Sequence, residues 1–483
     1  MKGRGVGVTV QTGVIGAVRN AVASQRVSAE EAVQAALDRI EKLDKPINAV
    51  VAMRAEEALA EARELDKRIH AGHEIGPLAG VPVLVKDLED VTGLRTTMGS
   101  VIFADAAPAK SDGLIPSRLR AAGAIVVGKD NLPEFACEGY TSNLLFGTTR
   151  NPWALDWSPG GSSGGSGAAV SAGMVPIATA TDGGGSIRIP SAFCGLVGIK
   201  PSGGVIPRRP IPDWIDFSTD GPLATTVADL RLLLSIESGP EPGDPTALPK
   251  PDLINGRGPK RLLAIPRFGA GGPLPDEVTR IFDAAVQTAS EVFGLEVERL
   301  DPAHLWTDGN PDEDWFVLAT AEHVSRLGRE LVEANLGRMH VSARSFMEYG
   351  LGVTIDAYLA ARRRRFGYVR DLDLLIGEDA VILSPTVIST GFLADGRLTM
   401  QDEPGMLPGD AFNTGLANIT GHPAMSLPAG VCSNGVPFGL QVMGPRFCDA
   451  TLLDLAEEWE RANPWPRTAP GYDSFETELG LSV

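Results

Sequence analysis

The chain has 483 residues, of which 43% are hydrophobic and 22% charged, and this composition excludes a mainly disordered protein. The formal net charge of −18 argues against a nucleic-acid-binding protein, whose surface would be basic. Four cysteines without a close pair argue against both a disulfide framework and a zinc site. No uninterrupted apolar run of about 18 residues occurs, so we expect no membrane span and a cytoplasmic protein.

Residues 1–74 are expected to form a helical segment that packs on the core. Val14, Val18 and Val22 fall on one face of a helix. Ser28 and Glu31 form the pattern of a capping box, which predicts a helix from there to about residue 43. A second helix is predicted over residues 55–69.

Residues 75–483 are expected to form one α/β domain. Apolar runs predict buried strands, which alternate with helical segments such as residues 117–122. This alternation predicts a large mixed β-sheet covered by helices on both faces. Residues 239–258 are rich in proline and glycine and predict a long surface loop within the domain. The predicted strands are residues 81–85, 124–127, 262–265 and 380–383.

Two glycine-serine segments are the most informative feature of the chain. They comprise residues 160–167 (GGSSGGSG) and 182–186 (DGGGS), and Ser162 and Ser186 lie 24 positions apart. Glycine loses the most backbone entropy on folding and has no side chain to bury. Packing of a hydrophobic core therefore does not explain so many glycines in two short segments. Glycines do let backbone N–H groups approach a ligand closely. The pattern therefore indicates a substrate carbonyl that gains negative charge and a serine nucleophile.

The serine needs a base, and Lys86 is the first candidate. It ends the apolar run 81–85, and burial would lower its pKa because a desolvated amine disfavours the charged form. Two other motifs compete with this interpretation. Residues 123–129 (GAIVVGK) resemble a phosphate loop, but Asp130 replaces the required Ser or Thr. The 160–165 segment also fits a nucleophile elbow, which would recruit a later histidine. The candidate histidines are His304, His323, His340 and His422.

Several segments in order resemble the amidase signature hydrolases, which use a Ser-cisSer-Lys triad. The resemblance extends from about residue 75 to about residue 444 and includes both glycine-serine segments. The other matching segments are residues 80–87 (GVPVLVKD), 193–201 (FCGLVGIKP), 418–424 (NITGHPA) and 437–441 (PFGLQ). One departure is visible, because the family commonly has Thr or Ile where this chain has Gly183. That departure predicts extra room at the substrate carbonyl.

The resemblance implies roles for individual residues. Ser186 would be the acylating nucleophile, Ser162 the relay serine that follows a cis peptide bond, and Lys86 the neutral base. The helix that begins near Ser166 would point its positive end at the site. The oxyanion hole would be formed by Gly183, Gly184, Gly185 and Ser186.

Further residues are implied around this triad. Ser163, Asp182 and Arg188 would hold the loops, while Ala136 and Cys137 would border the substrate together with Ser162. The walls of the pocket would come from residues 213–217, 305–316 and 390–413.

The resemblance implies a metal- and cofactor-independent amidase, acting as a monomer or homodimer on a small-molecule amide, with no nucleic-acid or membrane partner. Its substrates would be aryl, aliphatic or oligomeric amides, with possible ester or carbamate (urethane) side activity. A glutaminase subunit of a tRNA-dependent amidotransferase and a non-catalytic binding protein of the same fold remain as alternatives. The segment 181–186 (TDGGGS) differs from the SDTGGS usual in that subunit, so the amidase is preferred.

Overall fold

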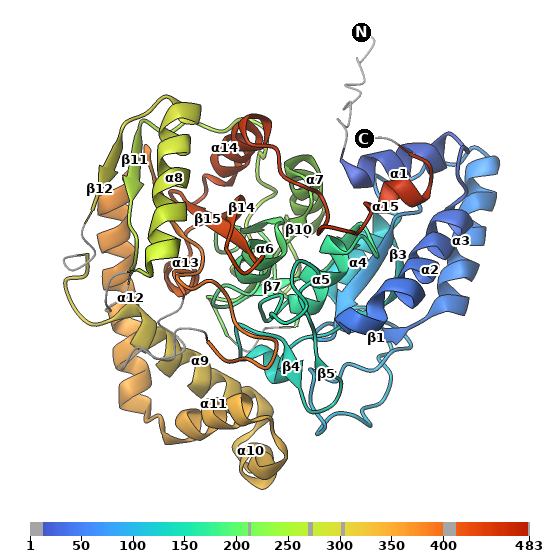
Figure 1. The fold of residues 1–483 in the computed structure, drawn as a ribbon. Helices are drawn as coiled ribbons and strands as arrows, with labels where there is room; N and C mark the ends of the chain where they lie inside the picture. The colour runs from blue at the N-terminus through green and yellow to red at the C-terminus, as the bar shows by residue number, and fades with distance from the viewer. Residues whose placement is uncertain (1–12, 211–213, 269–273, 301–304, 399–411, 482–483) are drawn as a thin grey trace.

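The computed structural model describes residues 13–210, 214–268, 274–300, 305–398 and 412–481. Helices lie outside two main groups of strands, and two short helices lie in the middle of the molecule (Figure 1). The predicted α/β class, with helices covering a mixed sheet, is confirmed.

Hydrogen bonding divides the strands between two main sheets. The first has the order β1-β3-β2-β6, in which β2 runs parallel to β3 and β6 while β1 is antiparallel. Its strands are β1 (Val50–Met53), β2 (Pro82–Lys86), β3 (Ile125–Asp130) and β6 (Ile177–Ala178).

The second sheet has seven strands in the order β10-β8-β14-β15-β13-β11-β12. Only β11 has parallel neighbours on both sides, so this sheet is mixed. Its edge strand β10 lies beside β6, so the two sheets meet edge to edge. The strands are β8 (Val197–Lys200), β10 (Leu223–Ala224), β11 (Arg261–Ala264), β12 (Val297–Arg299), β13 (Ala380–Pro385), β14 (Ala424–Val431) and β15 (Pro437–Met443). Two further ribbons pair β4 (Ser142–Asn143) with β5 (Gly147–Thr148) and β7 (Thr181–Asp182) with β9 (Thr219–Asp220).

The helices cover these sheets. Helices α2 and α3 pack on the first sheet, while α8 and α12 pack on the second. None of the helices within the described ranges combines the length and apolar character needed to cross a membrane. Their bounds are α1 (Val14–Ala23), α2 (Ala29–Ile47), α3 (Ala55–His70), α4 (Leu114–Ala121), α5 (Gly164–Ser171), α6 (Arg188–Cys194), α7 (Val227–Glu237), α8 (Asp276–Phe293), α9 (Pro311–Leu327), α10 (Arg329–Asn335), α11 (Val341–Gly352), α12 (Ile355–Ile376), α13 (Gly415–Thr420), α14 (Asp449–Ala462) and α15 (Phe475–Glu478), with 3₁₀ turns η1 (Glu134–Ala136) and η3 (Leu336–Arg338).

The N-terminal elements largely follow the sequence predictions. Ser28 caps α2, and both hydrogen bonds of the capping box to Glu31 are present. The helix continues to Ile47, beyond the predicted end, and stops where Asn48 adopts a left-handed conformation. Strand β1 was not predicted, and it joins the N-terminal segment to the first sheet through β3. The boundary between residues 74 and 75 stays a prediction.

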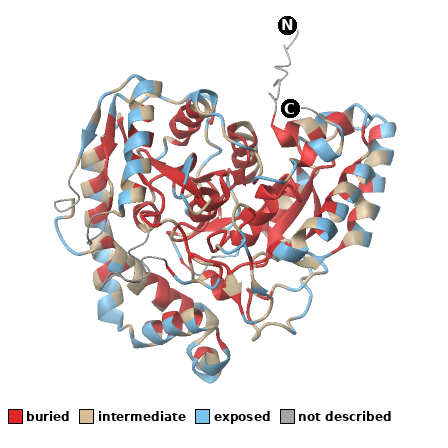
Figure 2. Ribbon diagram, in the orientation of Figure 1, coloured by how far each residue is buried: buried red, intermediate tan, exposed pale blue. Residues whose placement is uncertain are grey.

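Helices α5 and α6 occupy the centre, and every residue of both is buried (Figure 2). Helix α5 has the sequence GGSGAAVS, and its small side chains allow α6 to pack closely against it. The need for close approach explains the small-residue composition of this segment. Because each glycine-serine segment leads into one of these helices, the packing brings the two segments together.

Candidate active site

The two glycine-serine segments meet at the amino-terminal ends of α5 and α6. Ser163 is the N-cap residue of α5, and its amide donates a hydrogen bond to the carbonyl of Ser186, at 3.3 Å. The three serines differ in exposure: Ser186 retains 8%, whereas Ser162 and Ser163 retain 1% and 0%. All three are buried, and Ser186 is the most exposed of them.

Lys86 is the last residue of β2, and its side chain contacts two of these serines, Ser162 and Ser163. Its Nζ atom hydrogen-bonds three hydroxyls, those of Ser162 at 2.8 Å, Ser163 at 2.9 Å and Thr181 at 2.8 Å. The side chain is completely buried, and this desolvation lowers its pKa from 10.5 to about 7, despite the opposing charges of Asp130 and Glu89. A neutral amine has two N–H donors and one lone pair, so among three hydroxyl partners one can donate to it.

The peptide bond between Gly161 and Ser162 is cis, as the resemblance implies. Gly161 fits here because a Cβ at this position would lie 2.5 Å from the carbonyl oxygen of Glu138 and 2.8 Å from the backbone of Tyr140. Glycine is therefore required where the chain presents Ser162 to Lys86.

The carbonyls of the second segment are held by side chains from elsewhere in the fold. Trp315 Nε1 donates to the carbonyl of Gly183 at 2.7 Å, and Thr414 Oγ1 donates to that of Gly184 at 2.5 Å. The amide of Gly185 donates to Asp182 Oδ1 at 2.7 Å and is therefore occupied. Within the described residues no backbone hydrogen bond engages the other three predicted oxyanion amides, those of Gly183, Gly184 and Ser186.

Asp182 and Arg188 form a fully buried ion pair that fixes the second segment. Arg188 Nη2 and Nε donate to the two carboxylate oxygens at 2.8 and 3.0 Å. Burial alone would raise the pKa of Asp182, but the Arg188 charge and the hydrogen bonds outweigh it and lower that pKa. Asn418 Nδ2 also donates to Asp182 Oδ1 at 2.9 Å, and Gln441 Oε1 accepts from Arg188 at 2.8 Å.

We predict that Asp182→Ala strongly destabilises the fold, by about 3–5 kcal/mol, because it leaves the Arg188 charge buried without its partner. Urea denaturation would measure the loss. Arg329→Ala is the control, since the Arg329–Glu333 pair is 57% and 53% exposed and should contribute little. Equal effects of the two substitutions would contradict a structural role for the buried pair.

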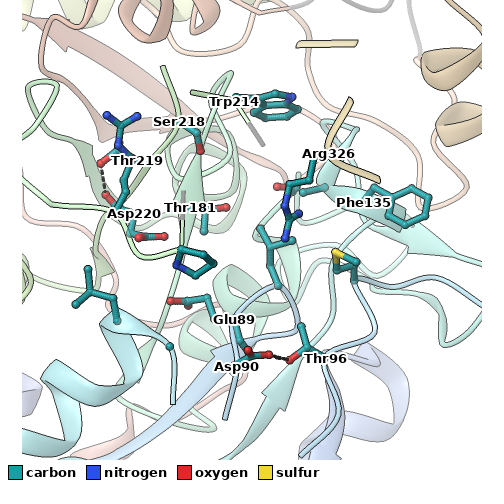
Figure 3. A pocket seen from close by; sticks show the side chains of 18 of the residues that line it. Glu89, Asp90, Thr96, Phe135, Thr181, Trp214, Ser218, Thr219, Asp220 and Arg326 are labelled. Atoms are coloured by element: carbon teal, nitrogen blue, oxygen red, sulfur yellow. Dashed lines mark hydrogen bonds between the residues drawn. The ribbon is translucent and has the colours of Figure 1, made fainter. Parts of the chain in front are cut away.

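A cavity of about 320 Å³ opens at Ser162, which is the one residue of the implied triad among its lining residues. Figure 3 shows other side chains of the lining. Ser162, Thr181 and Ala136 line the cavity, whereas Cys137 is not among its lining residues and instead has its sulfur 3.9 Å from His323 Nε2. Phe135 and Ala136 both adopt positive φ angles, of 56° and 59°, in the turn that borders the cavity.

Three acidic residues also line this cavity, and two of them, Glu89 and Asp220, act on the charge of Lys86. Burial raises the pKa of Glu89 to about 8 and that of Asp220 to about 6. The charges of both carboxyls, when ionised, favour protonation of Lys86 and therefore counteract part of its desolvation.

The extra room predicted at Gly183 is not open space. An ideal Cβ at this position would lie 1.8 Å from Cε3 of Trp214, so the indole already fills the volume. Trp214 lies within the predicted wall 213–217, of which Asp213 is outside the described residues. Trp315 belongs to the predicted wall 305–316, and residues 399–411 of the third predicted wall are outside the described ranges.

Among the other candidates, the phosphate-loop motif is structural, whereas His323 lines the cavity. Residues 125–130 form strand β3, and Lys129 Nζ is buried 2.8 Å from Asp87 Oδ1, so a phosphate loop is excluded. His340 Nδ1 lies 2.8 Å from Ser342 Oγ. Burial lowers the pKa of His422 to about 4, and its Nε2 lies 3.2 Å from Asp373. His304 lies outside the described residues.

Comparison with known proteins identifies the family of this chain. A family model described as Amidase matches residues 31–453. An acylamidase of Rhodococcus erythropolis is 34% identical, over 93% of this chain and 95% of its own length. A glutamyl-tRNA(Gln) amidotransferase chain of a Cyanothece species is also 34% identical, over 92% of this chain and 96% of its own.

Among solved structures, a bacterial aryl acylamidase described as an amidase signature enzyme matches with a TM-score of 0.83 and 28% identity, covering 96% of this chain and 98% of its own. The family match and the full-length relatives together establish that the chain belongs to the amidase signature family and is an amide-hydrolysing enzyme.

Proposed function

We propose that Ser186 is the acylating nucleophile, Ser162 the proton relay and Lys86 the base. The Ser186 hydroxyl attacks the amide carbonyl and passes its proton to Ser162, whose own proton moves to Lys86 Nζ. The tetrahedral intermediate then collapses, the C–N bond breaks, and the leaving amine takes a proton from Ser162, which regains one from the protonated Lys86. Water attacks the acyl-enzyme by the same relay and releases the acid and free Ser186.

The observation that carries this proposal is the environment of Lys86. An amine with a pKa of about 7 is largely unprotonated just above neutrality, and its Nζ atom lies 2.8 Å from Ser162 Oγ. A lysine in water, with a pKa near 10.4, would be protonated there and could not accept a proton. Burial at the end of the strand thus supports Lys86 as the general base, a role that an exposed, protonated lysine could not have.

Backbone amides stabilise the oxyanion in this proposal. The amides of Gly183, Gly184 and Ser186 are the donors that we retain, since Gly185 donates to Asp182. The amino end of α5 adds positive potential. Ser163, Asp182 and Arg188 hold the two loops, and Ala136 and Cys137 remain the predicted borders of the substrate.

The substrate is proposed to be an aryl, aliphatic or oligomeric amide, with esters and carbamates as possible side substrates. The relatives named acylamidase and aryl acylamidase support small acyl amides. The glutaminase subunit is the second candidate, favoured by the equally similar amidotransferase chain. Incubating the chain alone with anilides, aliphatic amides, carbamates, esters and glutamine separates them: turnover of glutamine only would reverse the ranking. A cytoplasmic location and a monomeric or homodimeric state stay predictions.

We predict that substitution of His323, His340 or His422 leaves kcat within about tenfold of the parent, provided that the variant is folded. Disabling a triad histidine costs on the order of 10⁴-fold. Steady-state kinetics after a circular-dichroism check would measure this. Chelating agents should likewise leave activity unchanged, and a loss of several orders of magnitude in either experiment would point to a histidine triad or a metal.

A further inference from the structure

Gly183 and Trp214 form a matched pair beside the proposed nucleophile. An ideal Cβ at position 183 would lie 1.8 Å from Cε3 and 2.2 Å from Cζ3 of the indole. Real Cβ atoms do not approach a ring so closely, so any larger residue at this position would have to displace Trp214 or the nucleophile loop.

The indole is held firmly by its surroundings. Trp214 Nε1 donates a hydrogen bond to the carbonyl of Ala319, at 3.0 Å. The ring lies nearly parallel to Phe217, with centroids 6.1 Å apart, and packs edge-on against Trp315 at 5.6 Å. It cannot swing away from Gly183 without breaking these contacts, so the pair behaves as one packed unit.

Trp214 also forms part of the cavity wall that Ser162 and Ala136 line (Figure 3). Only 7% of the residue is exposed, so most of the indole is packed against its neighbours. Phe135 also belongs to the lining, but it is completely buried and its ring packs against Phe103 and His323. Trp214 therefore supplies a flat apolar part of a wall that otherwise includes charged side chains.

We propose that Trp214 is a specificity-determining residue of this enzyme, and that with Gly183 it selects amides bearing a planar aromatic group over those bearing a puckered or branched one. The inference rests on the proposed acyl-enzyme chemistry at Ser186. A flat ring fits against the indole, whereas a thicker group meets a wall that cannot yield. Shortening Trp214 removes that wall.

The kinetic experiment compares matched pairs of amides. One pair varies the amine, as an anilide and the corresponding cyclohexylamide; the other varies the acyl group, as a benzamide and the corresponding cyclohexanecarboxamide. In at least one pair, Trp214→Ala should lower the planar-to-puckered ratio of kcat/KM by about tenfold or more, within the range that apolar pockets discriminate. Intrinsic reactivity cancels because each ratio is compared between parent and variant.

Two further variants control for loss of packing. Trp465 is partly buried against the other main hydrophobic cluster and donates to the backbone carbonyl of Thr225 at 3.1 Å, but it neither lines the cavity nor belongs to a predicted pocket wall, so Trp465→Ala should leave both ratios unchanged. Trp214→Phe keeps an aromatic wall and should retain most of the parental preference. If Trp214→Ala changes the two members of both pairs by the same factor, the proposal is overturned.

A stability measurement tests the pairing without relying on activity. Gly183→Ala should lower Tm when Trp214 is present and lower it far less in the Trp214→Ala background, because the clash has been removed. Equal losses in both backgrounds would contradict the pairing. A parent enzyme that hydrolyses no amide would instead overturn the proposed function and the specificity with it, while the Tm result would still decide whether the two residues are matched.

Discussion

Ser186→Ala is expected to lose essentially all turnover, by at least about 10⁴-fold in kcat, while substrate still binds. The proposed mechanism forms its covalent bond through this hydroxyl, and Ser186 is the most exposed of the three serines at the site. Single-turnover kinetics with an anilide would measure the loss, and equilibrium binding would show that the pocket persists.

The triad should also behave as one unit. Ser162→Ala and Lys86→Met each interrupt the relay, so combining either with Ser186→Ala should add little to the loss. Ser163→Ala is the matched control, because Ser163 also hydrogen-bonds Lys86 but is proposed only to hold the loop, and its loss should be clearly smaller. Near-normal activity of Ser186→Ala, or covalent labelling of Ser163 by a sulfonyl fluoride, would exclude Ser186 as the nucleophile.

The residues proposed for the triad were candidates from the sequence because each carries a local signal. Lys86 ends a wholly apolar strand, and the glycines around Ser162 and Ser186 exceed what packing requires. The burial of α5 also follows from its small residues alone. Local composition thus pointed to the two glycine-serine segments and to Lys86, whereas their combination into one triad came from the resemblance to the amidase signature family.

The supporting residues could not be predicted in the same way. Thr181 completes the set of hydroxyls on Lys86, although the two residues lie 95 positions apart. Asn418 reaches Asp182 across 236 positions. These contacts depend on how the two sheets and α13 pack against one another. No short sequence pattern predicts this tertiary packing. Strand β1 was missed because four residues give too short a periodic signal.

The position of Trp214 in the pocket likewise could not be predicted from the sequence. A single tryptophan in a loop predicts neither its orientation nor its neighbours, and the absence of a side chain at Gly183 was interpreted as free space. The indole fills that space because Phe217 and residues of α9 hold it there. Only the three-dimensional packing reveals that the two positions are complementary.

The protonation state of Lys86 should control the pH dependence of catalysis. We expect kcat/KM to rise with pH through an apparent pKa of about 7 and then to level off. Only the neutral amine can take the proton from Ser162. Asp220→Asn should shift this apparent pKa further down, because the Asp220 carboxylate favours the protonated amine. Initial rates from about pH 5 to 10 measure both profiles. Lys86→Met should be inactive over this whole pH range, because methionine has no group that can accept the proton.

Stability gives an independent check on the same amine. In the folded chain its pKa is about 7, against 10.5 for an unperturbed lysine, so between these values the unfolded chain binds a proton that the folded chain does not. The contribution of Lys86 to stability therefore increases with pH across this window, and its full cost is present below the folded-state pKa. Methionine removes that cost, although it also deprives three hydroxyls of a partner at every pH. The difference in Tm between Lys86→Met and the parent should thus favour the variant more at about pH 6 than at about pH 10. A difference that is independent of pH, together with a flat activity profile, would mean that Lys86 does not change protonation state on folding and that the relay needs another base.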